Sequence, residues 1–106
     1  MITEKQINEN IKRVVDNYHP DKIILFGSYS NGQPDEDSDL DLIIIKNTDL
    51  PKQRRGRNIR KYLFGSFIPM DLKIYTPMEY DNDIMNPYSF LHTAIKNSLT
   101  LYERKK

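Results

Sequence analysis

Carboxylates crowd one short stretch of this chain in a pattern that could bind a cation. Five acidic residues fall within seven positions: Asp35, Glu36, Asp37, Asp39 and Asp41. The last of them lies inside LDLIII, residues 40–45, an apolar run that is typical of a buried strand. Like charges held together repel, and removing each from water costs several kcal/mol unless a positive charge compensates. The acids therefore either stay in a solvated loop or hold a cation.

Asp39 and Asp41 have the spacing that lets a strand direct two carboxylates to the same side. Alternate residues of a strand face the same way, so Asp39 and Asp41 lie on one face of the predicted strand and the leucines at positions 40 and 42 lie on the other. Asp71 occupies the polar face of a later predicted strand, and pairing of the two strands would add a third carboxylate. Hard cations such as Mg²⁺ take oxygen ligands. Three acids can hold two such ions about 3.5 to 4 Å apart, the arrangement that clamps attacking and leaving oxygens in a phosphoryl displacement.

Gly27 and Ser28 supply the other half of a phosphate site. Gly27, at the end of a predicted strand, lets the backbone approach a ligand closely, and Ser28 offers a hydroxyl and backbone N–H groups to a phosphate. A nucleoside triphosphate would fit there. The chain contains neither GxxxxGK[ST] nor GxGxxG, which excludes a P-loop, a dinucleotide fingerprint and a kinase glycine loop.

The elements that must position these residues follow from periodicity and turn signals. Thr3 and Gln6 have the spacing of a capping box for an amphipathic first helix. Ser28 is expected to cap a short helix that ends by Gly32. The other predicted elements are a helix over residues 4–17, strands over 22–26 and 40–46, a basic helix over 50–64, a half-buried strand over 68–76, a short helix or turn after Pro77, a helix over 88–97 and an edge strand over 99–103.

Composition limits the classes of protein that fit. A chain of 106 residues suffices for one domain and one hydrophobic core. A net charge of +1 does not favour a general nucleic-acid or membrane binder. Without cysteine there are no disulfides or thiolate metal sites, and no apolar run is long enough to span a membrane. We expect a soluble, cytoplasmic protein that does not take nucleic acid as a direct ligand.

Gly27-Ser28, ten intervening residues, Asp39-Leu40-Asp41 and a later strand carrying Asp71 resemble the signature of the minimal nucleotidyltransferases (MNT) of the DNA polymerase beta superfamily. MNT proteins are often paired with HEPN proteins as toxin–antitoxin systems. The resemblance covers nearly the whole chain and implies an α+β fold, a small mixed β-sheet flanked by helices in one domain over residues 1–106.

The resemblance also implies roles for the matched residues. Gly27 and Ser28 would hold the triphosphate, and Asp39 and Asp41 would ligate two Mg²⁺ ions. Asp71 would ligate the ion that activates the attacking hydroxyl. The implied reaction is attack of an acceptor hydroxyl on the α-phosphate of ATP, with release of pyrophosphate and transfer of AMP. The implied acceptor is a tyrosine of a cognate HEPN toxin, brought by that partner protein.

Several alternatives stay open at this stage. The carboxylates of Asp81 and Asp83, expected in a loop, compete with Asp71 for the third position. The basic segment Lys52 to Lys61 could contact nucleotide phosphates or a nucleic acid, or it could form a solvated or partner-binding helix face. The chain could instead be a catalytically silent antitoxin that acts by occlusion, or a transferase for a small molecule such as an aminoglycoside.

Overall fold

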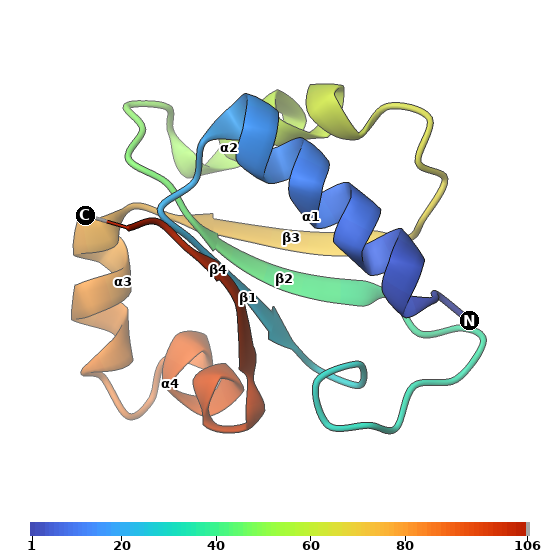
Figure 1. Cartoon of the computed structure of the whole chain (residues 1–106). Helices are drawn as coiled ribbons and strands as arrows, with labels where there is room; N and C mark the ends of the chain where they lie inside the picture. Colours follow the sequence, from blue (N-terminus) through green and yellow to red (C-terminus); the bar gives the residue numbers. More distant parts are fainter. Residues whose placement is uncertain (106) are drawn as a thin grey trace.

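The computed structural model describes residues 1–105 and contains one mixed sheet with helices on both sides (Figure 1). The strand order is β3-β2-β1-β4; β1 runs antiparallel to β2 and β4, and β2 runs parallel to β3. This architecture confirms the predicted α+β class. In chain order the elements are α1 (Glu4–Tyr18), β1 (Lys22–Phe26), β2 (Leu40–Ile45), α2 (Lys52–Arg60), a 3-10 turn (Lys61–Leu63), β3 (Met70–Tyr75), α3 (Pro77–Ile84), α4 (Phe90–Ala94), a 3-10 turn (Ile95–Asn97) and β4 (Leu99–Glu103).

Helices α1 and α2 cover one face of the sheet, and α3 and α4 cover the other (Figure 1). Because β2 is buried on both faces, its sequence is an almost continuous apolar run instead of an alternating one. Asp41 interrupts that run near the start of β2, opposite Phe26 of β1. The buried residues of the first face are Val14, Tyr18, Ile23, Leu25, Leu40, Leu42, Ile44, Ile59, Leu63 and Ile74, and those of the second are Ile24, Phe26, Ile43, Ile45 and Leu91.

The first helix begins and ends where local chemistry predicts. Thr3 accepts a hydrogen bond from the backbone N–H of Gln6 at 3.1 Å, and the Gln6 side chain accepts from Thr3 N at 2.8 Å, so the capping box forms. His19 adopts a left-handed conformation with φ 54° and ends the helix. The helix extends to Tyr18, whose ring is buried against the sheet.

An ion pair between the buried Arg55 and the partly exposed Glu79 joins α2 to α3 across the end of β3. The Arg55 side chain is only 7% exposed, and its Nη1 and Nη2 donate to the two Glu79 carboxylate oxygens at 2.6 and 3.2 Å. Arg55 Nε also donates to Leu50 O at 2.8 Å. Glu79 Oε1 accepts from Thr76 N as part of the α3 capping box. The basic helix is therefore only partly a solvated face, because one of the five cations of α2 is a structural residue.

The predicted short helix at Ser28 is wrong. Residues 28–32 form turns, in which Gly27 O accepts from Ser30 N at 3.1 Å and from Asn31 N at 3.2 Å. Gly27 and Gly32 have φ values of 76° and 78°, and these left-handed residues at both ends leave no room for a second helical turn.

The remaining boundaries differ from the predictions by a few residues. The strands predicted over 40–46 and 68–76 span Leu40–Ile45 and Met70–Tyr75. The helix predicted over 88–97 begins at Phe90, after the N-cap Ser89, and continues as a 3-10 turn from Ile95. The predicted edge strand over 99–103 matches β4. No helix within residues 1–105 is both long and apolar enough to cross a membrane.

The Arg55–Glu79 pair predicts a pH dependence of stability. Hydrogen bonding to the Arg55 guanidinium lowers the pKa of Glu79 from 4.5 to about 2. A lowered folded-state pKa stabilises the fold above pH 4.5, and that contribution is lost as the pH falls towards 2. Between these pH values, the free energy of unfolding of the wild type should fall by about 3 kcal/mol more than that of Glu79→Gln. Urea titrations across this range measure the difference.

Asp81→Asn is the matched control, since Asp81 lies exposed on the same helix. Its unfolding free energy should follow the wild-type pH profile. A Glu79→Gln profile that runs parallel to the wild type would contradict the stabilising role of the pair.

Candidate active site

Three aspartates lie at one end of the sheet because of the strand register. Asp41 lies opposite Phe26 of β1 on one side and opposite Asp71 of β3 on the other. Asp39 precedes Asp41 by two residues, at the end of the β1–β2 loop. Leu40 belongs to the core on the α1 side, so the aspartates of β2 and β3 face the α3 and α4 side. The predicted pairing of the second and third strands is confirmed.

The surroundings of Asp41 raise the pKa of its carboxyl. Burial raises its pKa, and the charges of Asp71 and Asp39 raise the pKa further. Lys73 acts in the opposite direction, and its Nζ lies 3.7 Å from Asp71 Oδ2. Desolvation combined with like charges is typical of functional sites, because folding alone gains nothing from it.

Gly27 faces Asp41 at very short range. A Cβ built on Gly27 would lie 2.3 Å from Asp41 Oδ2, and the φ of 76° also disfavours any residue with a side chain. The close approach leaves the Gly27 backbone directly beside the carboxylate. Ser28 follows in the turn and is partly exposed.

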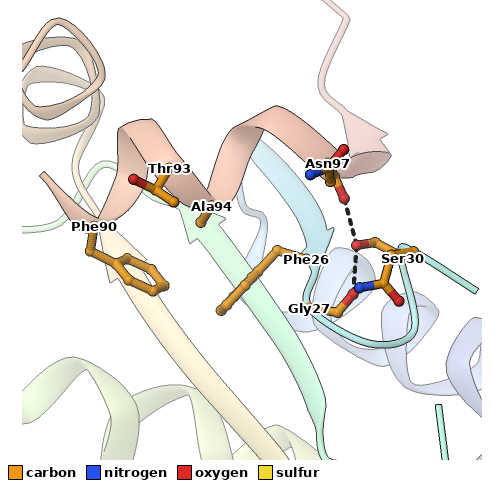
Figure 2. A pocket seen from close by; sticks show the side chains of 8 residues that line it. Phe26, Gly27, Ser30, Phe90, Thr93, Ala94 and Asn97 are labelled. Carbon is orange, nitrogen blue, oxygen red and sulfur yellow. Dashed lines mark hydrogen bonds between the residues drawn. The ribbon is translucent and has the colours of Figure 1, made fainter. Parts of the chain in front are cut away.

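Ser30 and Asn97 tie this turn to the C-terminal part of the chain, and the sequence did not point to them. Ser30 Oγ lies 2.8 Å from Gly27 O and 2.6 Å from Asn97 O (Figure 2). A single hydroxyl hydrogen is shared between these two carbonyls. The arrangement holds the Gly27 turn against the 3-10 turn that follows α4. No local sequence signal could have revealed it, because the two segments are 67 residues apart.

A pocket of about 250 Å³ opens beside Gly27, between the end of β1 and α4 (Figure 2). The Phe26 and Phe90 rings meet there edge to face, with centroids 5.5 Å apart. Lys73 Nζ lies 5.1 Å from the Phe90 centroid and so connects the pocket to the aspartates. The lining residues are Phe26, Gly27, Ser30, Asn31, Phe90, Thr93, Ala94 and Asn97.

Asp81 and Asp83 lie in α3, not in the predicted loop. Asp81 lines a separate hollow that includes Lys22, at the opposite end of β1 from Phe26. Asp35 and Asp37 form an exposed turn in which Asp35 Oδ1 accepts from Asp37 N at 2.9 Å. Register therefore selects Asp71 as the acid beside Asp41.

The donor chemistry at this end suits a hard cation, because carboxylate oxygens are the ligands that such an ion prefers. Within residues 1–105, no three acidic, histidine or cysteine side chains are placed to coordinate one ion together. The Asp71 carboxylate contacts Lys73. Since Asp71 and Asp41 are register partners, their backbones are already neighbours.

Comparison with known proteins identifies the family. A sequence model described as "Polymerase beta, Nucleotidyltransferase" matches residues 9–106. The chain belongs to this family. It is also 32% identical over 68 residues to the protein "Putative protein adenylyltransferase MJ0141" of Methanocaldococcus jannaschii, a match that covers 64% of this chain and 67% of that protein.

Solved structures of the nucleotidyltransferase fold superpose on most of the chain. One is described as a "putative nucleotidyltransferase from Sulfolobus solfataricus", with a TM-score of 0.66, 17% identity and coverage of 96% of this chain and 81% of that one. Two mutants described as "toxin-antitoxin MntA-HpeT" have TM-scores of 0.63 and 0.61 and identities of 21% and 23%. They cover 92% and 93% of this chain and 73% of theirs. At these identities the likeness shows the fold alone.

The contact between Gly27 and Asp41 predicts unequal effects at two glycines with the same backbone conformation. Gly32→Ala should cost about 1 kcal/mol of unfolding free energy, because its positive φ disfavours Ala but nothing lies within 4 Å of the new Cβ. Gly27→Ala should cost at least about 1 kcal/mol more, because its Cβ collides with Asp41. Chemical denaturation of both variants measures the difference. Equal losses would show that Asp41 does not constrain this glycine.

Crowding of like charge predicts that removing one carboxylate stabilises the protein. Since the folded-state pKa of Asp41 is raised, its ionised form destabilises the native state at neutral pH. Asp41→Asn should therefore raise the free energy of unfolding by up to about 1 kcal/mol. Asp37→Asn, in the exposed turn, should change it by less than about 0.5 kcal/mol. A destabilised Asp41→Asn protein in thermal melts would argue for a structural role of the carboxylate.

Proposed function

We propose that the chain is a Mg²⁺-dependent nucleotidyltransferase that moves AMP from ATP to a protein hydroxyl. The observation that carries the proposal is the register that sets Asp41 beside Asp71, with the Gly27 backbone against Asp41. Membership of the polymerase beta nucleotidyltransferase family supports the reaction class. The name of the M. jannaschii relative supports a protein as the acceptor.

The aspartates would hold the metal. Asp39 and Asp41 would each supply carboxylate oxygens to two Mg²⁺ ions, and Asp71 would complete the site by turning from Lys73 towards Asp41. The ions would neutralise charge on the phosphates and lower the pKa of the attacking hydroxyl. Lys73 is then free to meet a phosphate oxygen, which gives its ammonium group a partner in either arrangement.

The turn after β1 would hold the triphosphate. Gly27 has no side chain, so phosphate oxygens can reach the backbone there, and the Ser28 hydroxyl lies next in the chain. The phosphates of a nucleotide are joined to the ribose only through the rotatable bonds of the 5′ oxygen and the C5′ methylene, so a neighbouring pocket must orient the nucleoside. The cavity beside Phe26 and Phe90 adjoins this turn, and its aromatic rings would hold the base (Figure 2). Asn31 and Thr93 also line the cavity and would offer polar groups.

The acceptor we propose is a tyrosine of a HEPN toxin, which nucleotidylation would inactivate. The support is the resemblance to MNT proteins and the shared fold with the two MntA-HpeT structures. In this scheme the acceptor hydroxyl attacks the α-phosphorus of ATP, and the bond from that phosphorus to the bridging oxygen breaks. Pyrophosphate leaves, and the hydroxyl proton is released.

Intact-mass analysis of a candidate HEPN protein after incubation with the chain, ATP and Mg²⁺ tests the proposal. One or more added AMP units are expected with the wild type. The double variant Asp39→Asn/Asp41→Asn should react at least about a hundredfold more slowly, because the metal contributes several kcal/mol to the transition state.

Asp35→Asn/Asp37→Asn is the matched control, since it removes two acids from the same loop but none from the sheet end. It should retain wild-type transfer. A stable complex without any added AMP would contradict the enzyme and favour a silent antitoxin that acts by occlusion.

A further inference from the structure

The loop that leads into β3, residues 64–69, exposes two large aromatic side chains. Phe64 is 88% exposed and Phe67 is 96% exposed, in the sequence FGSF. Burying a phenylalanine is worth about 1.5 to 3 kcal/mol, and neither side chain gains this within the chain. Exposed apolar groups that lie close together mark interaction surfaces more often than single ones do.

The loop is held in place, so this exposure is not that of a frayed segment. Arg13 Nη1 donates to Phe64 O at 3.1 Å and ties the loop to α1. Ser66 N donates to Leu63 O at 3.1 Å, and Ile68 N to Ser66 Oγ at 3.2 Å. The Ile68 side chain packs on the core of the α1 face. An anchored backbone therefore presents both rings to solvent.

Phe67 also has an unfavourable backbone conformation. Its φ of 57° lies in the left-handed region, where a bulky residue is strained and glycine is favoured. Neither burial nor backbone preference explains a phenylalanine at this position. Strain at a solvent-facing residue is retained where the side chain serves a function outside the fold.

The loop lies beside the candidate active site. It enters β3 at Met70, which pairs with Leu40 of β2, one residue before Asp71 and Asp41 pair. Figure 1 shows this loop and the β1–β2 loop at the same end of the sheet. A protein that rests on the two rings would lie next to the aspartates.

Basic residues at the end of α2 lie beside the loop 64–69. Acidic residues of the β1–β2 loop lie on the other side of the candidate active site. Phe67 and Arg60 line a common hollow of about 190 Å³, where Arg60 Nη2 donates to Met70 O at 3.1 Å. Lys61 is exposed three residues before Phe64. The β1–β2 loop, with exposed Asp35 and Asp37, would repel a polyanion laid across this end. The charge pattern therefore favours a folded protein with its own ordered charges over a nucleic acid.

We infer that Phe64 and Phe67 anchor the acceptor protein, which would take the two rings in an apolar groove with an acidic rim facing Arg60 and Lys61. The inference rests on the proposed transfer to a HEPN protein. Each phenylalanine can bury at least about 150 Å², so the pair supplies over a third of the about 800 Å² that one side of a stable interface contributes. Aromatic residues, phenylalanine among them, and arginine are enriched in protein interfaces, where a few anchoring side chains carry most of the binding energy.

The test measures binding separately from transfer. The Asp39→Asn/Asp41→Asn protein, in which transfer is slowed, is titrated with the HEPN protein in a calorimeter without ATP, with and without Phe64→Ala/Phe67→Gly. The dissociation constant should rise at least about 30-fold in the Phe-loop variant. In the wild-type background the same loop variant should keep its affinity for Mg²⁺-ATP. Its unfolding free energy should not fall, because Phe67→Gly removes backbone strain and no buried contact.

Met78→Ala is the matched control, as Met78 is 74% exposed on α3, beyond the other end of β3. It should change the dissociation constant by less than about threefold. Lys61→Glu should weaken binding about tenfold at low salt and less at high salt.

Three results would overturn the docking surface. They are unchanged HEPN affinity in the Phe-loop variant, no HEPN binding by the wild type, and tight binding of single-stranded RNA that the Phe-loop variant loses. Loss of HEPN binding in the variant together with no AMP transfer by the wild type would leave the docking surface standing and remove the proposed activity.

Discussion

The parallel pairing of β2 with β3 is the constraint on which the candidate site depends. It sets Asp41 opposite Asp71, while the antiparallel pairing of β2 with β1 sets Asp41 opposite Phe26 and next to Gly27. A shift of β3 by one residue would turn Asp71 to the α1 side and place Leu72 among the acids, because neighbouring residues of a strand face opposite ways. The site is therefore a property of the sheet register.

The core on both faces of the sheet keeps that register in place against charge repulsion. Asp41 is partly desolvated beside two other carboxylates, which the fold would avoid if stability alone mattered. Buried leucines and isoleucines along the rest of β2 offset this cost, and a slip would expose them. The Arg55–Glu79 pair adds a second constraint, because it joins α2 to α3 at the far end of β3. The strand that carries Asp71 is thus held by apolar packing along its length and by an ion pair beyond its end.

The surroundings of the aspartates divide into regions of different chemistry. Towards α4 lies an aromatic pocket bordered by Lys73, which suits a nucleoside with its phosphates. Towards α1 and α2 lies a loop with two solvent-facing rings and a cationic border, which suits a protein surface. The two regions flank the same pair of strand ends. A reaction that joins a nucleotide to a protein needs both sides to be accessible at once.

Local patterns in the sequence determined much of this protein. The capping box at Thr3 and Gln6, the apolar runs of the inner strands and the alternation around Asp71 predicted α1 and three strands within a few residues. Each depends on neighbours in the chain, as does the two-residue spacing that puts Asp39 and Asp41 on one side of a strand. The turn at Ser28 was wrongly predicted as helix, since two left-handed glycines outweigh the capping preference of serine. Only the tertiary structure decided which acid lies beside Asp41, that the buried Arg55 pairs with Glu79, and that Ser30 bonds to Asn97. These contacts join segments that are distant along the chain, so they form only when the sheet and its helices assemble.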